Sequence, residues 1–212
     1  QNTASGVQAL FSNTTGSSNT ASGLNALFSN TTGSQNTASG LNALANNTTG
    51  FANTASGANA LTSNTGFANT ALGFQALFSN TTGGNNTGMG SGANVSAGNL
   101  SNATAIGAGA IVNASNKVRL GNTAVTVIEG QVAFTASSDK TKKENFQPVD
   151  GEAVLGKIRG FELSSWNFIG HDPKEFRHYG PMAQDFFAAF GQDGVGQIGT
   201  ETTINTGDLA GI

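Results

Sequence analysis

The sequence predicts a mainly β protein in which a parallel β-solenoid is followed by a small α+β module. Three observations support this prediction. Residues 2–98 repeat with a period of 17 residues. Residues 1–116 contain no Asp, Glu, Lys, Arg or His. Beyond residue 116 the chain has the charges, prolines and mixed patterning of an ordinary globular domain. We therefore expect three parts: a solenoid shaft or head (1–116), a β neck (117–137) and a terminal module (138–212).

The repeat units begin with Asn-Thr, and a short fixed period of this kind is typical of a solenoid. One leucine per unit, always preceded by Ala, predicts a stacked apolar column in a narrow core. One glycine per unit marks a place where the backbone turns or approaches a neighbour closely. The units start at Asn2, Asn19, Asn36, Asn53 and Asn69, with a degenerate unit at Asn86. The leucines are Leu10, Leu27, Leu44, Leu61 and Leu77. The glycines are Gly6, Gly23, Gly40, Gly57 and Gly73.

The polar residues of the repeat predict how neighbouring units are linked. The opening asparagines are expected to form ladders between units, and the Asn-Thr-Thr-Gly groups are typical of turns. One unit has too few apolar residues to be stable alone, so stacking and lateral association must bury more surface. The alternative is a disordered low-complexity tract, but the constant register of Leu and Gly favours the solenoid.

Composition restricts the function. The chain has nine Lys and Arg, twelve Asp and Glu, and a net charge of −3, so no basic surface indicates nucleic acid as a partner. Cysteine is absent, which excludes disulfides and thiolate chemistry. No apolar run is long enough to span a bilayer. His171 and His178 have no third ligand in a suitable pattern, so we expect no metal and no cofactor. The chain opens inside a repeat, and we expect it to be part of a longer protein.

Residues 102–110, NATAIGAGA, resemble the rungs of trimeric autotransporter adhesin heads. Those heads are left-handed parallel β-rolls in which three chains form one spike. The resemblance covers residues 2–116 and implies a homotrimer. A trimer would also bury the apolar surface that stacking of the units leaves exposed.

The patterning after the repeat predicts short elements. Alternating residues over 117–121 and 123–134 indicate a β neck, although an ordinary hairpin of the next domain is the alternative. A helix is expected from Gly151 to Lys157 with Ile158, ending at Gly160. Strands are expected over 161–169 and 175–179, with a turn between them. A second helix, AQDFFAAF, is expected to stop at Gly191. Trp166 and the phenylalanines of this helix are expected in the core or a trimer interface.

Ser138 and Lys143 are candidate catalytic residues, because a nearby lysine can act as the base for a serine nucleophile. Lys143 could do so only if burial or neighbouring positive charge lowers its pKa, and Lys140 and Lys142 are close in sequence. The alternative is structural: Ser138 caps a turn and Lys143 is a solvated charge.

Four segments of the terminal module resemble one family in order and spacing. They read SSDKTKKENF (137–146), VDGEAVLGKI (149–158), SSWNF (164–168) and RHYGPMAQDFFAAFG (177–191). The family is the C-terminal intramolecular chaperone domain of phage endosialidases, tailspikes and bacterial fibre proteins, and the resemblance covers residues 137–212. It implies a domain that trimerises its fibre and then cuts itself off with a Ser-Lys dyad.

The dyad positions of this family match Ser138, followed by Asp139, and Lys143. An arginine that is common shortly before the lysine is replaced by Lys140 and Thr141, which puts the efficiency of cleavage in doubt. The resemblance also implies a long final helix in a three-stranded coil, of which residues 209–212 would be the first turn.

The sequence thus predicts a trimeric fibre or adhesin segment, extracellular, on a bacterial surface or a phage tail. Its partners would be two identical chains and a surface ligand of unknown kind, with a glycan as one candidate. Whether it is an enzyme stays open: the candidate activity is one self-cleavage at Ser138, and a retained chaperone or tip cap is the alternative. A fibre-borne glycan hydrolase would need its carboxylates upstream of residue 1, because residues 1–116 have none. An ice-binding solenoid is a further alternative, with a ladder of Thr3, Thr20, Thr37, Thr54 and Thr70.

Overall fold

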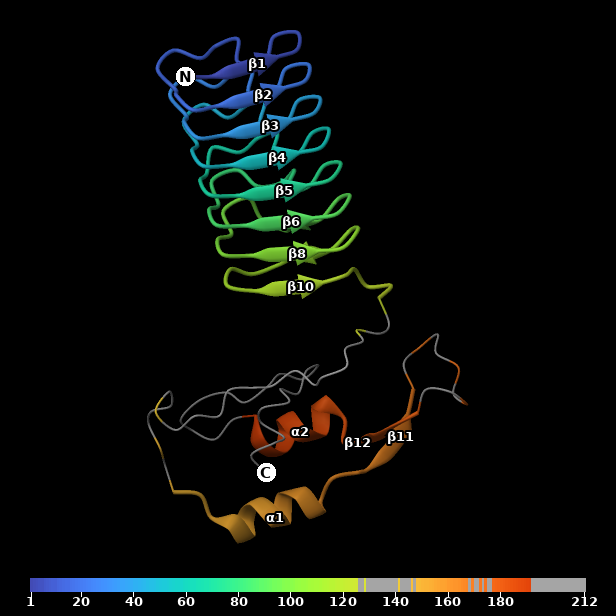
Figure 1. Cartoon of the computed structure of the whole chain (residues 1–212). Coiled ribbons are helices and arrows are strands. Elements are labelled where there is room, and N and C mark those ends of the chain that lie inside the picture. The colour runs from blue at the N-terminus through green and yellow to red at the C-terminus, as the bar shows by residue number, and fades with distance from the viewer. Residues whose placement is uncertain are drawn as a thin grey trace. The chain divides into compact units, whose positions relative to one another are not determined.

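The structure is a computed structural model of the whole chain (Figure 1). It describes residues 1–125, 128, 141, 146, 148–167, 169, 172, 174 and 177–191. The chain divides into two compact units, residues 1–129 and 130–212. The fold class predicted from the sequence is confirmed: the first unit contains a parallel β-solenoid, and the second contains two helices and a short sheet.

The solenoid stacks one short strand per repeat into an eight-stranded parallel sheet, seen as the column of arrows in Figure 1. Equivalent residues are paired: Thr20 lies beside Thr37, and Ala21 beside Ala38. Two further short strands form a separate parallel pair. The large sheet contains β1 (Thr3–Ser5), β2 (Thr20–Ser22), β3 (Thr37–Ser39), β4 (Thr54–Ser56), β5 (Thr70–Leu72), β6 (Thr87–Met89), β8 (Thr104–Ile106) and β10 (Val118–Leu120), and the pair is β7 (Asn94–Val95) with β9 (Ile111–Val112).

The core of the solenoid is a narrow stack of alanines and leucines. In the eight-stranded sheet, the middle residue of each strand from β2 to β6 and of β8 is a buried Ala or Gly, while its neighbours are more exposed. The predicted leucine column forms, and Leu27, Leu44, Leu61 and Leu77 are fully buried. Val95 and Val112 fill the core in the last coils. Each leucine contributes about 1.5–3 kcal/mol by leaving water.

The predicted asparagine ladder also forms, and it joins the coils through backbone as well as side-chain N–H groups. The side-chain oxygen of Asn19 accepts the backbone N–H of Asn36 at 3.0 Å, and Asn36 serves Asn53 in the same way. The amide nitrogen of Asn36 donates to the carbonyl of Gly50 in its own coil at 2.8 Å. One buried side chain therefore links two coils and closes a turn, which offsets the cost of burying an amide.

The second unit is built from two helices and one hairpin. The helices are α1 (Gly151–Arg159) and α2 (Ala183–Phe190), and the antiparallel strands are β11 (Ser164–Trp166) and β12 (His178–Gly180). Both helices and the stop at Gly191 agree with the prediction. No helix in the described ranges is long and apolar enough to cross a membrane.

The strands predicted for this unit were too long. The chain is not in a strand over residues 161–163, because Phe161 packs on the aromatic rings of α2 instead of continuing the hairpin. The returning strand begins only at His178 and runs to Gly180. Residues 175 and 176, and most of the predicted neck beyond residue 125, lie outside the described residues.

Candidate functional site

The predicted catalytic residues Ser138 and Lys143 both lie outside the described residues, as do Asp139, Lys140 and Lys142. The dyad therefore stays a prediction. The structure does describe most of the elements that follow it in the chain, from residue 148 to residue 191. These elements are described below.

Helix α1 is fixed at both ends by local chemistry. The carboxylate of Asp150 accepts the backbone N–H groups of Glu152 and Ala153, at 3.0 and 3.3 Å. This N-cap satisfies two donors that a helix start leaves free. Glu152 in the first turn and Lys157 in the last turn have the charges that suit the helix dipole. The helix is thus defined by its sequence as well as by packing.

An aromatic cluster forms a small core in the described part of the terminal unit. Phe161, Phe186 and Phe190 form it, with ring centroids 5.2–6.2 Å apart. Phe186 is the buried member. The ammonium group of Lys157 lies 5.0 Å from the centroid of Phe190 and also donates to the carbonyl of Ala189. Because Lys157 belongs to α1, this cation–π contact holds the two helices together.

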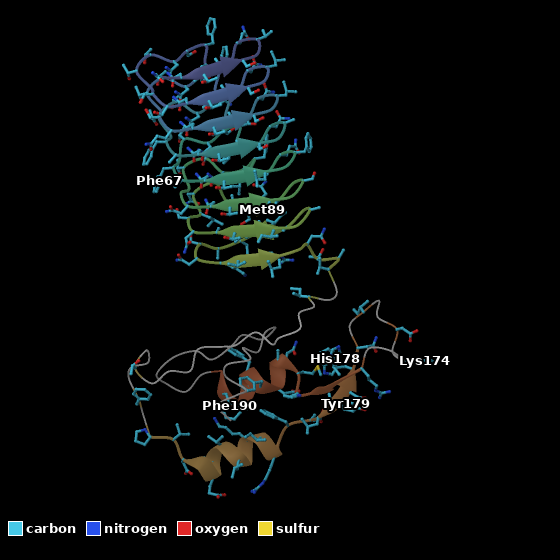
Figure 2. All side chains as sticks on the ribbon, in the orientation of Figure 1. Phe67, Met89, Lys174, His178, Tyr179 and Phe190 are labelled. Atoms are coloured by element: carbon cyan, nitrogen blue, oxygen red, sulfur yellow. The ribbon has the colours of Figure 1, made fainter. Side chains whose placement is uncertain are left out.

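The hairpin carries two aromatic side chains, of which Trp166 is half-buried and Tyr179 is exposed. Trp166 of β11 stacks on His178 of β12 with ring centroids 4.6 Å apart. His178 lies in a strand, as expected, while His171 lies outside the described residues. Tyr179 is 80% exposed, and Figure 2 labels it beside His178 on this hairpin. Leu163 and Val149 are also mostly exposed, so the described part of this unit carries several apolar side chains on its surface.

A groove of about 310 Å³ opens on the solenoid where its aromatic column is interrupted. Phe11 and Phe28 stack with ring centroids 5.5 Å apart, but the next coils have Ala45 and Thr62 at that position. Amide side chains line the rest of the groove. The lining residues are Gln8, Asn25, Phe28, Asn42, Ala45, Asn46 and Thr62. The repeat pattern alone did not predict this groove, although the replacement of Phe by Ala45 and Thr62 at one repeat position is a signal of it.

Titratable side chains provide no metal site in the part of the chain that the structure describes, since no cluster of three possible ligands occurs there. The chemistry of the described sites is therefore that of amides, hydroxyls and aromatic rings in the solenoid, and of aromatic and charged side chains in the terminal unit.

Comparison with known families bears directly on the terminal unit. Residues 138–195 match the family model described as chaperone of endosialidase. The resemblance inferred from the four segments is thereby confirmed. The matched segment begins at Ser138 and includes Lys143, both helices and the hairpin. No curated protein and no solved structure matched the chain.

Proposed function

We propose that the chain is a segment of a homotrimeric extracellular fibre, on a phage tail or a bacterial surface. In this proposal the solenoid forms the shaft or head, and the chaperone-of-endosialidase segment assembles three copies. The observation that carries the proposal is the match of residues 138–195, which follow a solenoid whose residues up to 116 have no charged side chain. A repeat without charges is suited to a structural role, because it has no carboxylate, imidazole or amine to act as a general acid or base.

The finer proposal is that the chaperone segment cuts the chain once at Ser138. Ser138 Oγ would attack the carbonyl carbon of an adjacent peptide bond, and Lys143 Nζ would take the hydroxyl proton and pass it to the leaving amine. Water would then hydrolyse the ester that remains. The family match supports this step because it begins at Ser138.

Lys143 must be neutral to act as this base, so its pKa has to fall well below the ordinary lysine value. Burial in an assembled trimer would lower it, and the positive charges of Lys140 and Lys142 would add to the effect. Cleavage would then occur only after the trimer has folded and assembled. The alternative is a retained chaperone or cap, which the replacement of the usual arginine by Lys140 and Thr141 favours.

The intact mass of the denatured chain tests the cleavage. We expect the wild-type chain to give two pieces separated beside Ser138, while Ser138→Ala and Lys143→Ala stay whole. Lys174→Ala is the matched control, because it removes an exposed ammonium from the matched segment and leaves the dyad and its neighbouring lysines. Light scattering on the same samples measures assembly. A wild-type chain that is trimeric and uncut would favour the retained chaperone, and a monomeric chain would contradict the whole proposal.

The surface ligand of the fibre belongs to the same proposal. A glycan is one candidate, and the groove between Phe28 and Thr62 combines an aromatic ring with several amides. No charged side chain lines this groove. It would therefore suit a neutral sugar better than an acidic one.

A further inference from the structure

The outer face of the eight-stranded sheet changes character along the solenoid. The third residue of each strand faces solvent, and in the first four strands it is serine. From β5 onward it is a large apolar residue in every strand. We call these four residues the apolar column: Leu72, Met89, Ile106 and Leu120, which are 37%, 42%, 39% and 40% exposed.

The apolar column is continuous because the strands are in register. Leu72 pairs with Met89, Met89 with Ile106, and Ile106 with Leu120. Figure 2 labels Met89 on the strand face of the solenoid. Strands in a sheet lie about 4.8 Å apart, so the four side chains form one unbroken ridge parallel to the stacking direction. Scattered exposed apolar residues are common, but a continuous ridge of them indicates a contact surface.

The area of this ridge restricts what can cover it. Four strands about 4.8 Å apart and three residues wide present on the order of 200 Å². A partner that binds independently needs about 800 Å² per side. The apolar column is therefore too small to recruit a free protein. It is large enough for a partner that another interface already holds close by, because tethering raises the effective concentration to the millimolar range.

A second copy of this chain meets these conditions. Residues 1–116 have no charged side chain, so identical coils can approach without repulsion. Arg119 of β10 is half-buried, and its Nε donates to the carbonyl of Gly121. Copies related by rotation about an axis parallel to the solenoid also carry their apolar columns at the same height.

We propose that the apolar column is the surface by which copies of the solenoid meet around the trimer axis. This inference rests on the proposed trimer and adds which face points inward. The coils of β5 to β10 would close against one another in a dry contact. The serine-bearing coils of β1 to β4 would face the axis with hydroxyl groups and stay hydrated.

Cysteine cross-linking of the whole chain tests this inference, because the natural chain has no Cys. Ile106→Cys places a thiol in the apolar column. Ile111→Cys is the matched control, since Ile111 is also exposed and lies in the two-stranded sheet, only five residues along the chain. Light scattering first establishes the trimer for each variant. Copper phenanthroline then oxidises thiols that meet, and denaturing electrophoresis separates linked from free chains.

We expect linked dimers from Ile106→Cys at about tenfold the yield of Ile111→Cys, since only held thiols are at high effective concentration. Three thiols near one axis can form a single pair, so one chain per trimer stays free. Equal yields, or no linkage in an intact trimer, would overturn the inference and leave the proposed trimer standing. Absence of any trimer would overturn both. If Ile106→Cys does not assemble, Met89→Cys at the neighbouring position is measured in the same way.

Discussion

Five leucines of the solenoid adopt the left-handed backbone conformation, with φ between 49° and 54°. This conformation costs an ordinary residue roughly 1–2 kcal/mol. The leucines tolerate it because burial returns a comparable amount and the backbone N–H stays bonded: that of Leu27 donates to the carbonyl of Ala43 at 3.0 Å. The five are Leu10, Leu27, Leu44, Leu61 and Leu77.

The glycine of each repeat is required both by its positive φ and by the close contact between coils. Gly40 has φ of 133°, and a Cβ there would lie 2.7 Å from the carbonyl carbon of Gly57. We expect Gly40→Ala to lower the free energy of unfolding by about 1–3 kcal/mol from backbone strain, with the clash adding to it. Urea unfolding followed by circular dichroism measures the change.

Gly156 of α1 is the control for this substitution, because a Cβ there would meet no atom within 4 Å. Gly156→Ala should stabilise the terminal unit by about 0.5–1 kcal/mol, since alanine is the better helix former. If Gly40→Ala were as harmless as Gly156→Ala, the coils would not be stacked as closely as the structure shows.

At the scale of the coil, the stabilising element is the buried asparagine that opens each repeat. The side-chain oxygen of Asn36 accepts the backbone and side-chain N–H groups of Asn53 in the next coil, and its amide nitrogen donates to Gly50 in its own coil. Both groups are needed, so neither a shorter nor a charged side chain can replace it. The asparagine ladder is uncharged throughout. A charge introduced there would have no partner, so its effect on stability tests the described hydrogen bonds.

We expect Asn36→Asp to destabilise the solenoid by about 3–5 kcal/mol at pH 7, because it buries an unpaired charge and removes the donor to Gly50. Burial should raise the folded-state pKa of the new carboxyl. The charge penalty is then complete above the folded pKa and fades as the pH falls toward the unfolded pKa.

Thermal unfolding at neutral and acidic pH measures this effect. Asn46→Asp is the matched control, because Asn46 lies in the same coil and is exposed. Equal destabilisation by the two variants, or a loss at Asn36 that is the same at both pH values, would show that the buried column does not have the bonding described above.

Repetition explains which elements could be predicted from the sequence. Leu44 and Gly40 recur in register, and a recurring residue must occupy the same place in every coil. The left-handed φ of Leu44 could not be predicted, because backbone conformation there follows from burial and not from local preference. The predicted end of the first hairpin strand was wrong for the same reason: Phe161 is apolar like a strand residue, but it packs on α2.

Ser138 and Lys143 were inferred from motif spacing, and that inference stays a prediction.

At the scale of the whole molecule, two units of unlike chemistry follow one another in the chain. All charged side chains lie at or beyond Lys117, and nearly the whole solenoid lies before it. The solenoid is stabilised by stacking and amide hydrogen bonds, while the terminal unit also uses a capped helix and a cation–π contact. The two units should therefore respond differently to conditions that act on charge.

Residue-resolved hydrogen exchange at several pH values tests this difference. Stability varies with pH only where the folded and unfolded states bind different numbers of protons. Coils without ionisable side chains bind none in either state, so their protection should be constant from about pH 4 to pH 10 after correction for intrinsic exchange. The terminal unit, with its carboxylates and lysines, is free to vary. If acid removed protection from the coils of β2 to β8 together with the terminal unit, the coils would depend on assembly through residues 130–212. Stacking alone would then be insufficient to keep them folded.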